Sequence, residues 1–347
     1  MIMLYAFELS GEHDQLPRAE ALACLDVEGL EYSEHAFFDQ CLVVDISGET
    51  APVEYKLHSI ADRLAMCHHV LKVAGIYPND PDIILEMVED TDIIDHIIPG
   101  QTYVVRVKRI RHHTDINSAQ LEGRVGGSIY RKGFSADLKN ADVVFRLILS
   151  EQCVFGSIVA SIDRSAYEAR APHKKPFFYP GVLMPRVARA LVNMAGIRAE
   201  DVVFDPFCGT AGMLVEAGLI GASTVGLEVQ AKILAGAQMN LEWFDTDHSL
   251  IVGDACRVPL VDECVDAIIT DPPYGRSARI EAKSLHHLYE ASFAEMYRVL
   301  TRGGTAVVVS EMPVEEYALD VGFVIRKEYV QRVHRSLTRL IAVLYKE

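Results

Sequence analysis

Short apolar segments alternate with helical patterns throughout residues 177–347, and this alternation restricts the possible folds more than any other feature of the chain. The expected strands are Val202–Asp205, Thr224–Glu228, Leu250–Val252, Val265–Thr270 and Thr305–Val309. Helical patterns at Gln230–Trp243 and Leu285–Leu300 lie between them. This order predicts a doubly wound, Rossmann-like parallel sheet of the α/β class. The last two apolar segments, Phe323–Tyr329 and Thr338–Tyr345, predict an antiparallel pair.

Residues 1–77 have a different order. Strand patterns are expected at Leu4–Leu9, Leu30–Phe37, Cys41–Ile46 and His69–Tyr77, and helical patterns at Leu16–Glu28 and Pro52–Met66. The order β-α-β-β-α-β is typical of a ferredoxin-like α+β domain. The turn-forming run Pro78-Asn79-Asp80-Pro81 marks its end.

A second compact α+β module is expected over residues 78–162. Its clearest strand, Thr102–Ile110, alternates apolar and basic residues, and Val143–Leu149 and Cys153–Ile162 are further strands. Residues 163–176 are polar, basic and bounded by prolines, so they are interpreted as a linker. The domain boundaries are therefore 1–77, 78–162, the linker 163–176, and 177–347.

Several classes of protein are excluded by composition. No apolar run reaches the roughly eighteen residues that a membrane-spanning helix needs, and the N-terminus has no basic segment typical of a signal peptide. The seven cysteines are scattered without a C-x-x-C pair, and the paired histidines lack a third ligand at suitable spacing. We expect a cytoplasmic protein with no membrane contact, no disulfide framework and no metal site.

The net charge of −16 is unevenly distributed. Residues 1–100 contain 20 Asp or Glu and 4 Lys or Arg, whereas residues 101–140 contain 8 Lys or Arg and 3 acidic residues. A basic face of this kind neutralises nucleic-acid phosphates, although ordinary solvated surface is the alternative. The candidate RNA-binding residues are Arg106, Lys108, Arg109, Arg111, Arg131 and Lys132.

The run Asp205-Pro206-Phe207-Cys208-Gly209-Thr210-Ala211-Gly212 joins an expected strand to a helix. Ligands of open α/β sheets bind beyond the carboxyl ends of the strands, and glycines let the backbone approach a ligand closely. This run is not the G-x-G-x-x-G fingerprint of dinucleotide sites. An acid at the strand end repels a pyrophosphate and suits the cationic methionine end of S-adenosylmethionine.

Two further acids follow the next two strands. Glu228 can accept hydrogen bonds from both ribose hydroxyls of a cofactor, and Asp254, followed by Ala255, can accept from an adenine amino group. Each acid alone could be a helix cap or a surface residue. Acids at three successive strand ends favour a cofactor site.

The run Asp271-Pro272-Pro273-Tyr274-Gly275 directly follows the apolar strand that ends at Thr270. Two prolines stiffen this loop and leave carbonyl oxygens available as acceptors. Asp271 and such a carbonyl can accept the hydrogens of an exocyclic amine, which aligns the nitrogen lone pair with a methyl donor. Tyr274 offers a flat face for stacking a flipped-out base. A purely structural Pro-Pro turn is the alternative.

With these motifs in this order, residues 177–347 resemble a class I S-adenosylmethionine-dependent amino methyltransferase with a D-P-P-Y motif. Tyr179-Pro180-Gly181 and the helical pattern Arg186–Ala195 resemble the motif that precedes the first strand in this family and lines the cofactor site. The resemblance thus implies cofactor contacts from Tyr179, Pro180, Asp205, Phe207, Gly209, Thr210, Gly212, Glu228, Asp254, Ala255 and Asp271. It implies catalytic roles for Asp271, Pro272, Pro273 and Tyr274.

Residues 82–162 resemble a THUMP domain, a tRNA-binding module. The whole chain is similar to the tRNA guanine-10 N2-methyltransferase family of archaeal type, through the motifs above and the run Val333-His334-Arg335-Ser336-Leu337-Thr338-Arg339. This resemblance implies S-adenosylmethionine as cofactor, tRNA as partner, and N2-methylguanosine or N2,N2-dimethylguanosine as product. The alternatives are a tRNA guanine-6 N2-methyltransferase, a DNA adenine-N6 methyltransferase, and an inactive tRNA-binding protein. No protein partner is indicated.

Overall fold

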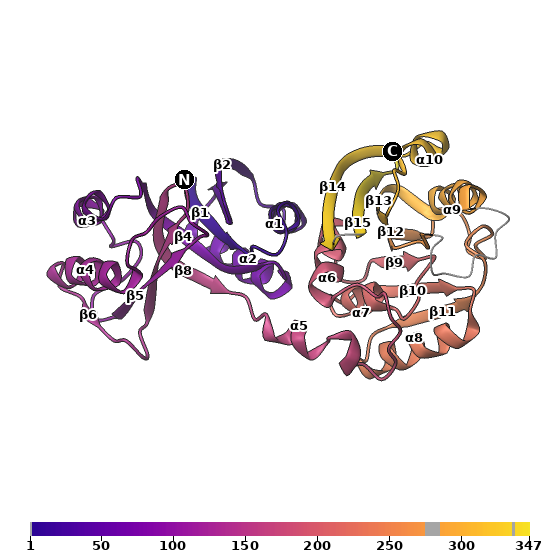
Figure 1. Cartoon of the computed structure of the whole chain (residues 1–347), viewed down its shortest axis with the longest axis horizontal. Helices are drawn as coiled ribbons and strands as arrows, with labels where there is room; N and C mark the ends of the chain where they lie inside the picture. The colour runs from indigo at the N-terminus through magenta and orange to yellow at the C-terminus, as the bar shows by residue number, and fades with distance from the viewer. Residues whose placement is uncertain (1, 275–284, 335–336) are drawn as a thin grey trace. The chain divides into compact units, whose positions relative to one another are not determined.

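The computed structural model describes residues 2–274, 285–334 and 337–347 (Figure 1). The chain forms two compact units. The N-terminal unit contains the chain up to Glu12, Glu28–Asp62 and Cys67–Asp163, and the C-terminal unit contains His13–Val27, Arg63–Met66 and Arg164–Glu347. None of the helices within the described ranges is long and apolar enough to cross a membrane.

The N-terminal unit is built on an eight-stranded sheet with the order β2-β3-β1-β4-β8-β7-β5-β6. Its strands are β1 (Ile2–Leu9), β2 (Tyr32–Phe38), β3 (Cys41–Ser47), β4 (Cys67–Tyr77), β5 (Thr102–Arg109), β6 (Ser135–Ala136), β7 (Val143–Leu149) and β8 (Cys153–Ser161). Helices α2 (Thr50–Arg63), α3 (Pro81–Asp90) and α4 (Ser118–Arg131) alternate with them. The predicted β-α-β-β-α-β order of residues 1–77 is confirmed, and β4 pairs with β8, so residues 1–77 and 78–162 contribute to one sheet.

Local sequence explains how α3 begins. The side chain of Asp80 accepts hydrogen bonds from the backbone N–H groups of Asp82 and Ile83, and Pro81 occupies the first helical turn. An N-cap acid followed by proline is a strong helix start. The turn predicted at Pro78–Pro81 therefore ends one strand and starts the next helix.

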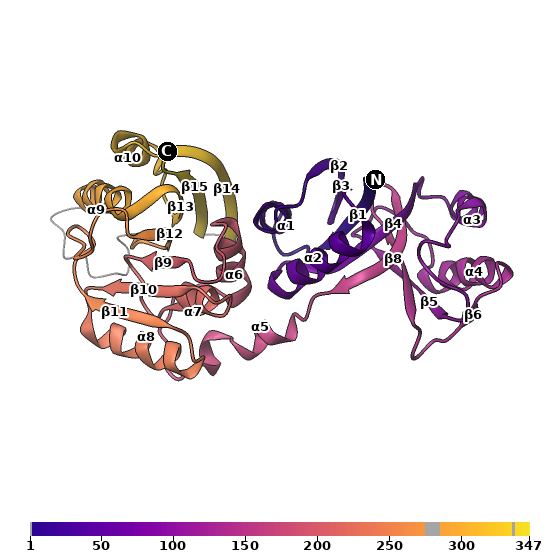
Figure 2. The same ribbon diagram turned by 180° about the vertical axis from the view of Figure 1, so that it is seen from behind.

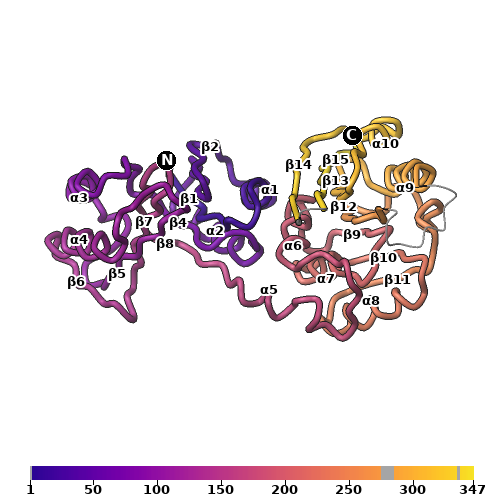
Figure 3. Tube along the Cα trace, in the orientation of Figure 1, coloured from indigo at the N-terminus to yellow at the C-terminus, as the bar shows by residue number. Residues whose placement is uncertain are grey.

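The C-terminal unit contains a seven-stranded sheet with the order β11-β10-β9-β12-β13-β15-β14. Its strands are β9 (Val202–Asp205), β10 (Ser223–Glu228), β11 (His248–Val252), β12 (Val265–Thr270), β13 (Leu300–Ser310), β14 (Val324–His334) and β15 (Leu337–Tyr345). The first five of these are parallel, and β14 and β15 form the antiparallel pair. This confirms the predicted doubly wound sheet, whose chain path can be followed in Figure 3.

Helices cover both faces of this sheet, as Figures 1 and 2 show from opposite sides. The helices are α1 (Leu16–Val27), α5 (Ser165–Ala169), the short 3-10 helix η1 (Pro172–Lys174), α6 (Pro185–Met194), α7 (Gly212–Gly218), α8 (Ala231–Trp243), α9 (Leu285–Val299) and α10 (Glu315–Val321). Apolar residues of α6, α7 and α8 share one core with Ile269 and Val307. Those of α9 and α10 share another with Ile268 and Val308. Alternate residues of each strand thus face opposite layers.

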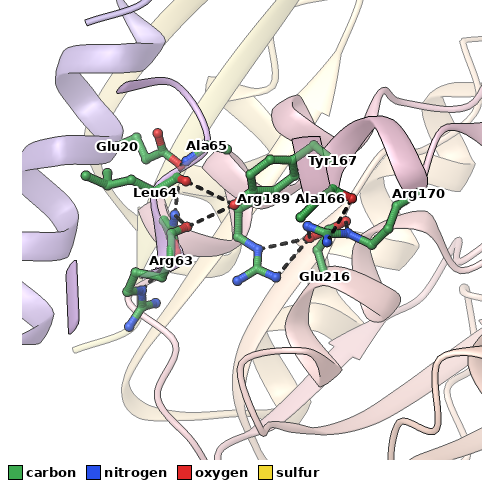
Figure 4. A network of polar contacts seen from close by, with 10 residues as sticks. Glu20, Arg63, Leu64, Ala65, Ala166, Tyr167, Arg170, Arg189 and Glu216 are labelled. Carbon is green, nitrogen blue, oxygen red and sulfur yellow. Dashed lines mark hydrogen bonds and ion pairs between the residues drawn. The ribbon is translucent and has the colours of Figure 1, made fainter. Parts of the chain in front are cut away.

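Helix α1 joins the core of the C-terminal unit although it lies early in the sequence. Leu16 and Ala19 pack in the same core as α6 and α7. The buried carboxylate of Glu20 accepts hydrogen bonds from the backbone N–H groups of Ala65 and Met66 and from the Asn193 amide. Figure 4 shows Glu20 and Ala65 in this network.

The same network continues to the helix that carries the glycine-containing loop. Glu216 of α7 is fully buried and forms ion pairs with Arg170 and Arg189 (Figure 4). Tyr167, in the segment expected to be a linker, is buried and donates a hydrogen bond to the carbonyl of Leu64. Residues 163–176 therefore hold packed helical turns that support α7.

Candidate active site

The strand order reverses between β9 and β12, which are neighbours in the sheet. In a doubly wound sheet this switch point, at the carboxyl ends of the strands, is where ligands bind. Asp205 ends β9 and Asp271 follows β12. The topology therefore places two of the predicted site acids on adjacent strands.

Asp205 is buried and held in place by two hydrogen bonds. Its Oδ1 accepts from the Thr270 hydroxyl at 2.8 Å and from the Phe207 backbone N–H at 3.0 Å. Burial raises the pKa of Asp205 to about 7, these hydrogen bonds oppose the rise, and the charges of Asp271 and Glu228 add to it. The pairing of β9 with β10 and β12 brings Asp205, Glu228 and Asp271 to one edge of the sheet, and carboxyl groups there are favourable for a cationic ligand.

The loop after Asp205 needs glycine for its backbone conformation. Gly209 has a φ of +51°, in the left-handed region that glycine adopts without strain. Gly212 begins α7, and a Cβ placed there would meet no atom within 4 Å. Open space beside the start of α7 leaves room for a ligand against the backbone.

Glu228 ends β10 and also anchors the neighbouring loops. Its Oε1 accepts a hydrogen bond from the Gln230 backbone N–H at 2.9 Å. Burial raises its pKa, and hydrogen bonds from the backbone of Gln230 and Gly209 oppose that rise. Its carboxylate thus ties the glycine-containing loop to β10, a role that the sequence did not indicate.

Asp254 is exposed beyond the end of β11, while Ala255 is buried. The Asp254 carboxylate accepts a hydrogen bond from the Cys256 backbone N–H at 2.9 Å. Because β11 is parallel to β10, Asp254 lies at the same edge of the sheet as Glu228.

Asn240 is a buried residue of α8 that sequence reasoning missed. Its side-chain oxygen accepts a hydrogen bond from the backbone N–H of Phe177. Its side-chain NH₂ group donates to the carbonyl of Phe177 and to that of Thr210 in the glycine-containing loop. The segment before α6 is thereby fixed beside that loop. Tyr179 and Pro180, two residues further on, are exposed.

Asp271 and its loop form the amine end of the site. The Tyr274 hydroxyl donates a hydrogen bond to the Asp271 carboxylate, while Pro272 is buried. Burial raises the pKa of Asp271 to about 6, and the Tyr274 hydrogen bond and the Arg339 charge oppose that rise. Tyr274 was expected to offer its ring to a base, and its hydroxyl makes a contact that this expectation did not include. Gly275, the next residue of the motif, lies outside the described residues.

Sequence comparison places the chain among known proteins. Residues 172–341 match the family model described as RMKL-like, methyltransferase domain. The tRNA (guanine(10)-N2)-dimethyltransferase of Methanothermobacter thermautotrophicus is 34% identical over 97% of this chain and 97% of its own length. The chain belongs to the tRNA (guanine(10)-N2)-dimethyltransferase family.

The chain is also similar to other named enzymes and to a solved structure. The tRNA (guanine(10)-N2)-dimethyltransferase of Pyrococcus abyssi is 30% identical over 98% of this chain and 99% of its own length. The bovine U6 snRNA (guanine-N(2))-methyltransferase THUMPD2 is 31% identical, but over only 55% of this chain and 37% of its own length. The crystal structure of TrmN from Thermus thermophilus has the same fold, with a TM-score of 0.57 at 22% identity, covering 99% of this chain and all of that one.

In this tRNA (guanine(10)-N2)-dimethyltransferase family member, the six basic candidates lie in two places. Arg106, Lys108 and Arg109 are on β5 with Arg111 just beyond it, and Arg131 and Lys132 end α4. Arg111 and Arg131 form ion pairs with Asp39 and Glu89, respectively. The Lys132 ammonium donates to backbone carbonyls, and Arg106 does the same. Among the residues that the structure describes, Lys108 and Arg109 form no ion pair.

Proposed function

We propose that this chain methylates the exocyclic N2 amine of a guanine in tRNA, at guanine 10, with S-adenosylmethionine as methyl donor. The placement of Asp271 beside Asp205 at the switch point carries this proposal, because it sets an amine acceptor next to a cation-attracting carboxylate. The near-full-length similarity to enzymes named for guanine 10 supports the tRNA position. We further propose that the enzyme works in the cytoplasm, where its tRNA substrate is found.

The residues at the sheet edge fit S-adenosylmethionine. Three neighbouring carboxyl groups favour a ligand with positive charge and hydroxyl donors and oppose one rich in phosphate. Open space beside Gly212 accommodates a ligand near the first turn of α7. On this proposal Asp205 faces the cationic methionine end, Glu228 the ribose, and Asp254 the adenine amine. When bound, the cofactor supplies an electrophilic methyl group.

Asp271 then orients the reacting nitrogen. Its carboxylate accepts one amine hydrogen and the Pro272 carbonyl accepts the other, so the lone pair points at the methyl carbon. As the new bond forms, positive charge develops on nitrogen, and these fixed acceptors stabilise it. The proton is easily lost to water afterwards, so Asp271 need not act as a formal base.

A second methylation is compatible with the same acceptors. N2-methylguanine retains one N–H, which Asp271 can accept, while the first methyl group takes the place of the other hydrogen. The relatives named dimethyltransferases support a dimethylated product. We therefore propose N2,N2-dimethylguanosine as the final product.

We propose that the basic residues of the N-terminal unit bind tRNA phosphates. Lys108 and Arg109 are the best test because they form no ion pair within the described ranges and, as adjacent strand residues, face opposite sides of β5. Lys108→Glu and Arg109→Glu are tested separately. The substitution on the face that binds tRNA should raise the KM for tRNA and reduce the slope of log affinity against log salt concentration by about 1. Lys327→Glu in the C-terminal unit is the matched control.

The decisive experiment is nucleoside mass spectrometry of an unmodified tRNA transcript after incubation with enzyme and S-adenosylmethionine, with the site mapped by nuclease digestion. N2-methylated guanosine at position 10 is the expected result. Methylation at position 6 would support the guanine-6 activity instead, and a parallel reaction with duplex DNA that yields methylated adenine would support the DNA methyltransferase activity. Cofactor binding in calorimetry with no methylated RNA would identify an inactive tRNA-binding protein.

A further inference from the structure

Two buried polar side chains on the neighbouring strands β14 and β15 have atoms with no hydrogen-bond partner among the described residues. They are Nε of Arg339 and Oε1 of Gln331, in residues that are 8% and 3% exposed. Buried polar atoms are almost always paired, and an unpaired one costs about 1–3 kcal/mol. Unpaired donors and acceptors at one edge of a sheet are typical of groups that a ligand completes.

Strand register places Arg339 at the same edge of the sheet as Asp271. β15 is antiparallel to β13, with Ser310 opposite Leu340, so the start of β15 lies at the carboxyl ends of the parallel strands. Thr270, the residue before Asp271, pairs with Val308, which in turn pairs with Ala342. Arg339 therefore lies beyond the row that contains Thr270, on the side where Asp271 continues the chain.

Gln331 is the cross-strand partner of Arg339. The two residues are directly opposite in the β14–β15 pair, so their side chains emerge on the same face. The Gln331 amide nitrogen lies 3.3 Å from Nε2 of His13, which leaves its oxygen as the unpaired group. An unpaired donor and an unpaired acceptor thus lie side by side.

Arg339 also acts on the residues of the amine motif. Burial raises the pKa of both Asp271 and Tyr274; the positive charge of Arg339 opposes the rise at Asp271, and its hydrogen bond opposes the rise at Tyr274. A guanidinium with a free N–H near an amine acceptor matches one edge of guanine. That edge presents the N2 amine and N1–H as donors, followed by O6 as an acceptor.

We propose that Arg339 is a specificity-determining residue that donates a hydrogen bond to O6 of the target guanine, with Gln331 accepting from N1–H. This inference rests on the proposed function and adds to it a reason why guanine is chosen. A purine with an amino group at position 6 would bring a donor against the Arg339 donor. Arg339 is the last residue of the run Val333–Arg339 named in the sequence analysis. Two residues of that run, Arg335 and Ser336, lie outside the described residues.

The test uses full-length enzyme and tRNA ligated from synthetic pieces, carrying at the methylated position either guanosine or 2,6-diaminopurine riboside. Both bases have the 2-amino group, but only guanine has O6. A bidentate or matched base contact is worth about 1–3 kcal/mol of discrimination, so the wild type should prefer guanosine roughly 10- to 100-fold in kcat/KM. Arg339→Met should reduce this ratio to about threefold or less, mainly by slowing methylation of guanosine.

Two further variants keep the result interpretable. Arg339→Lys retains the charge but removes the Nε–H, so the ratio should also fall in this conservative variant. Arg326→Met changes an arginine of the neighbouring strand β14, whose guanidinium lies 3.7 Å from the ring centre of Tyr345, and should leave the ratio unchanged. Loss of both activities by the same factor in the Arg339 variants would overturn the inference, because a structural role predicts that result. If wild-type enzyme methylates no guanosine at all, the proposed function fails instead.

Discussion

The Thr270 hydroxyl donates a 2.8 Å hydrogen bond to Oδ1 of Asp205, linking the ends of the two strands that flank the switch point. Thr270→Val removes this bond with little change in shape. The hydrogen bond favours the ionised form of Asp205. Its loss therefore reduces the ionised fraction of Asp205 and with it the attraction for a cationic ligand. S-adenosylmethionine affinity should fall about 3- to 10-fold in calorimetry. Thr270→Ser keeps the hydroxyl and should bind normally, and equal binding by both variants would exclude this role.

Substitution of Asp271 should affect turnover far more than cofactor binding. Asp271→Ala removes an acceptor positioned for the amine, and loss of such a group commonly slows reactions by roughly 10²- to 10³-fold. Asp271→Asn should be milder, since its amide oxygen still accepts. Single-turnover methylation of tRNA measures the effect, with cofactor affinity as the control. Near-normal turnover of Asp271→Ala would remove this residue from the mechanism.

Turnover should rise with pH through the pKa of Asp271. Burial raises that pKa to about 6, so the carboxyl is protonated below this value and presents a donor to an amine that needs an acceptor. With cofactor saturating, kcat should therefore fall on the acid side toward the level of Asp271→Asn, whose neutral amide resembles the protonated acid, and level off above about pH 7. Asp271→Asn does not titrate, and its profile should lack this acid limb. An unchanged limb in that variant would assign the titration to another group.

Asn240 should control cofactor affinity without touching the reacting amine. Asn240→Leu removes its hydrogen bonds to Phe177 and Thr210 and leaves buried backbone groups unpaired. Each lost hydrogen bond should cost about 1–3 kcal/mol, divided between the free energy of unfolding and the free energy of cofactor binding. Calorimetry and thermal unfolding measure the two parts. Gln238→Leu, on the exposed part of the same helix, is the matched control and should change neither.

Glu20 should be important for stability. Both of its carboxylate oxygens accept hydrogen bonds from buried donors, so Glu20→Gln must turn one N–H₂ group toward a donor. The free energy of unfolding should fall by about 1–3 kcal/mol in denaturant titrations. Glu12→Gln, in the exposed turn after β1, is the control. A variant as stable as the wild type would show that the network adapts to the substitution.

The sequence predicted the parallel sheet and the carboxylates at its edge because both depend on local patterns. Parallel strands bring their carboxyl ends to one edge, so Asp205 and Asp271 could be placed near each other from chain order alone. Asn240 and Arg339 could not be found in this way. Asn240 bonds Phe177, 63 residues away in the sequence, and Arg339 of β15 bonds Tyr274 in the loop after β12. A single buried amide or guanidinium leaves no periodic signal.

The fully buried Asn193 bonds Glu20 across 173 residues of chain, and this affects how the C-terminal unit folds. Its core requires α1, which leaves the ribosome early, and β15, which leaves after the other strands of the sheet. Contacts between distant segments slow folding because a long loop must close before they form. The sheet should therefore gain its final stability only after β15 has been synthesised, and a nascent chain lacking β15 should remain sensitive to proteases.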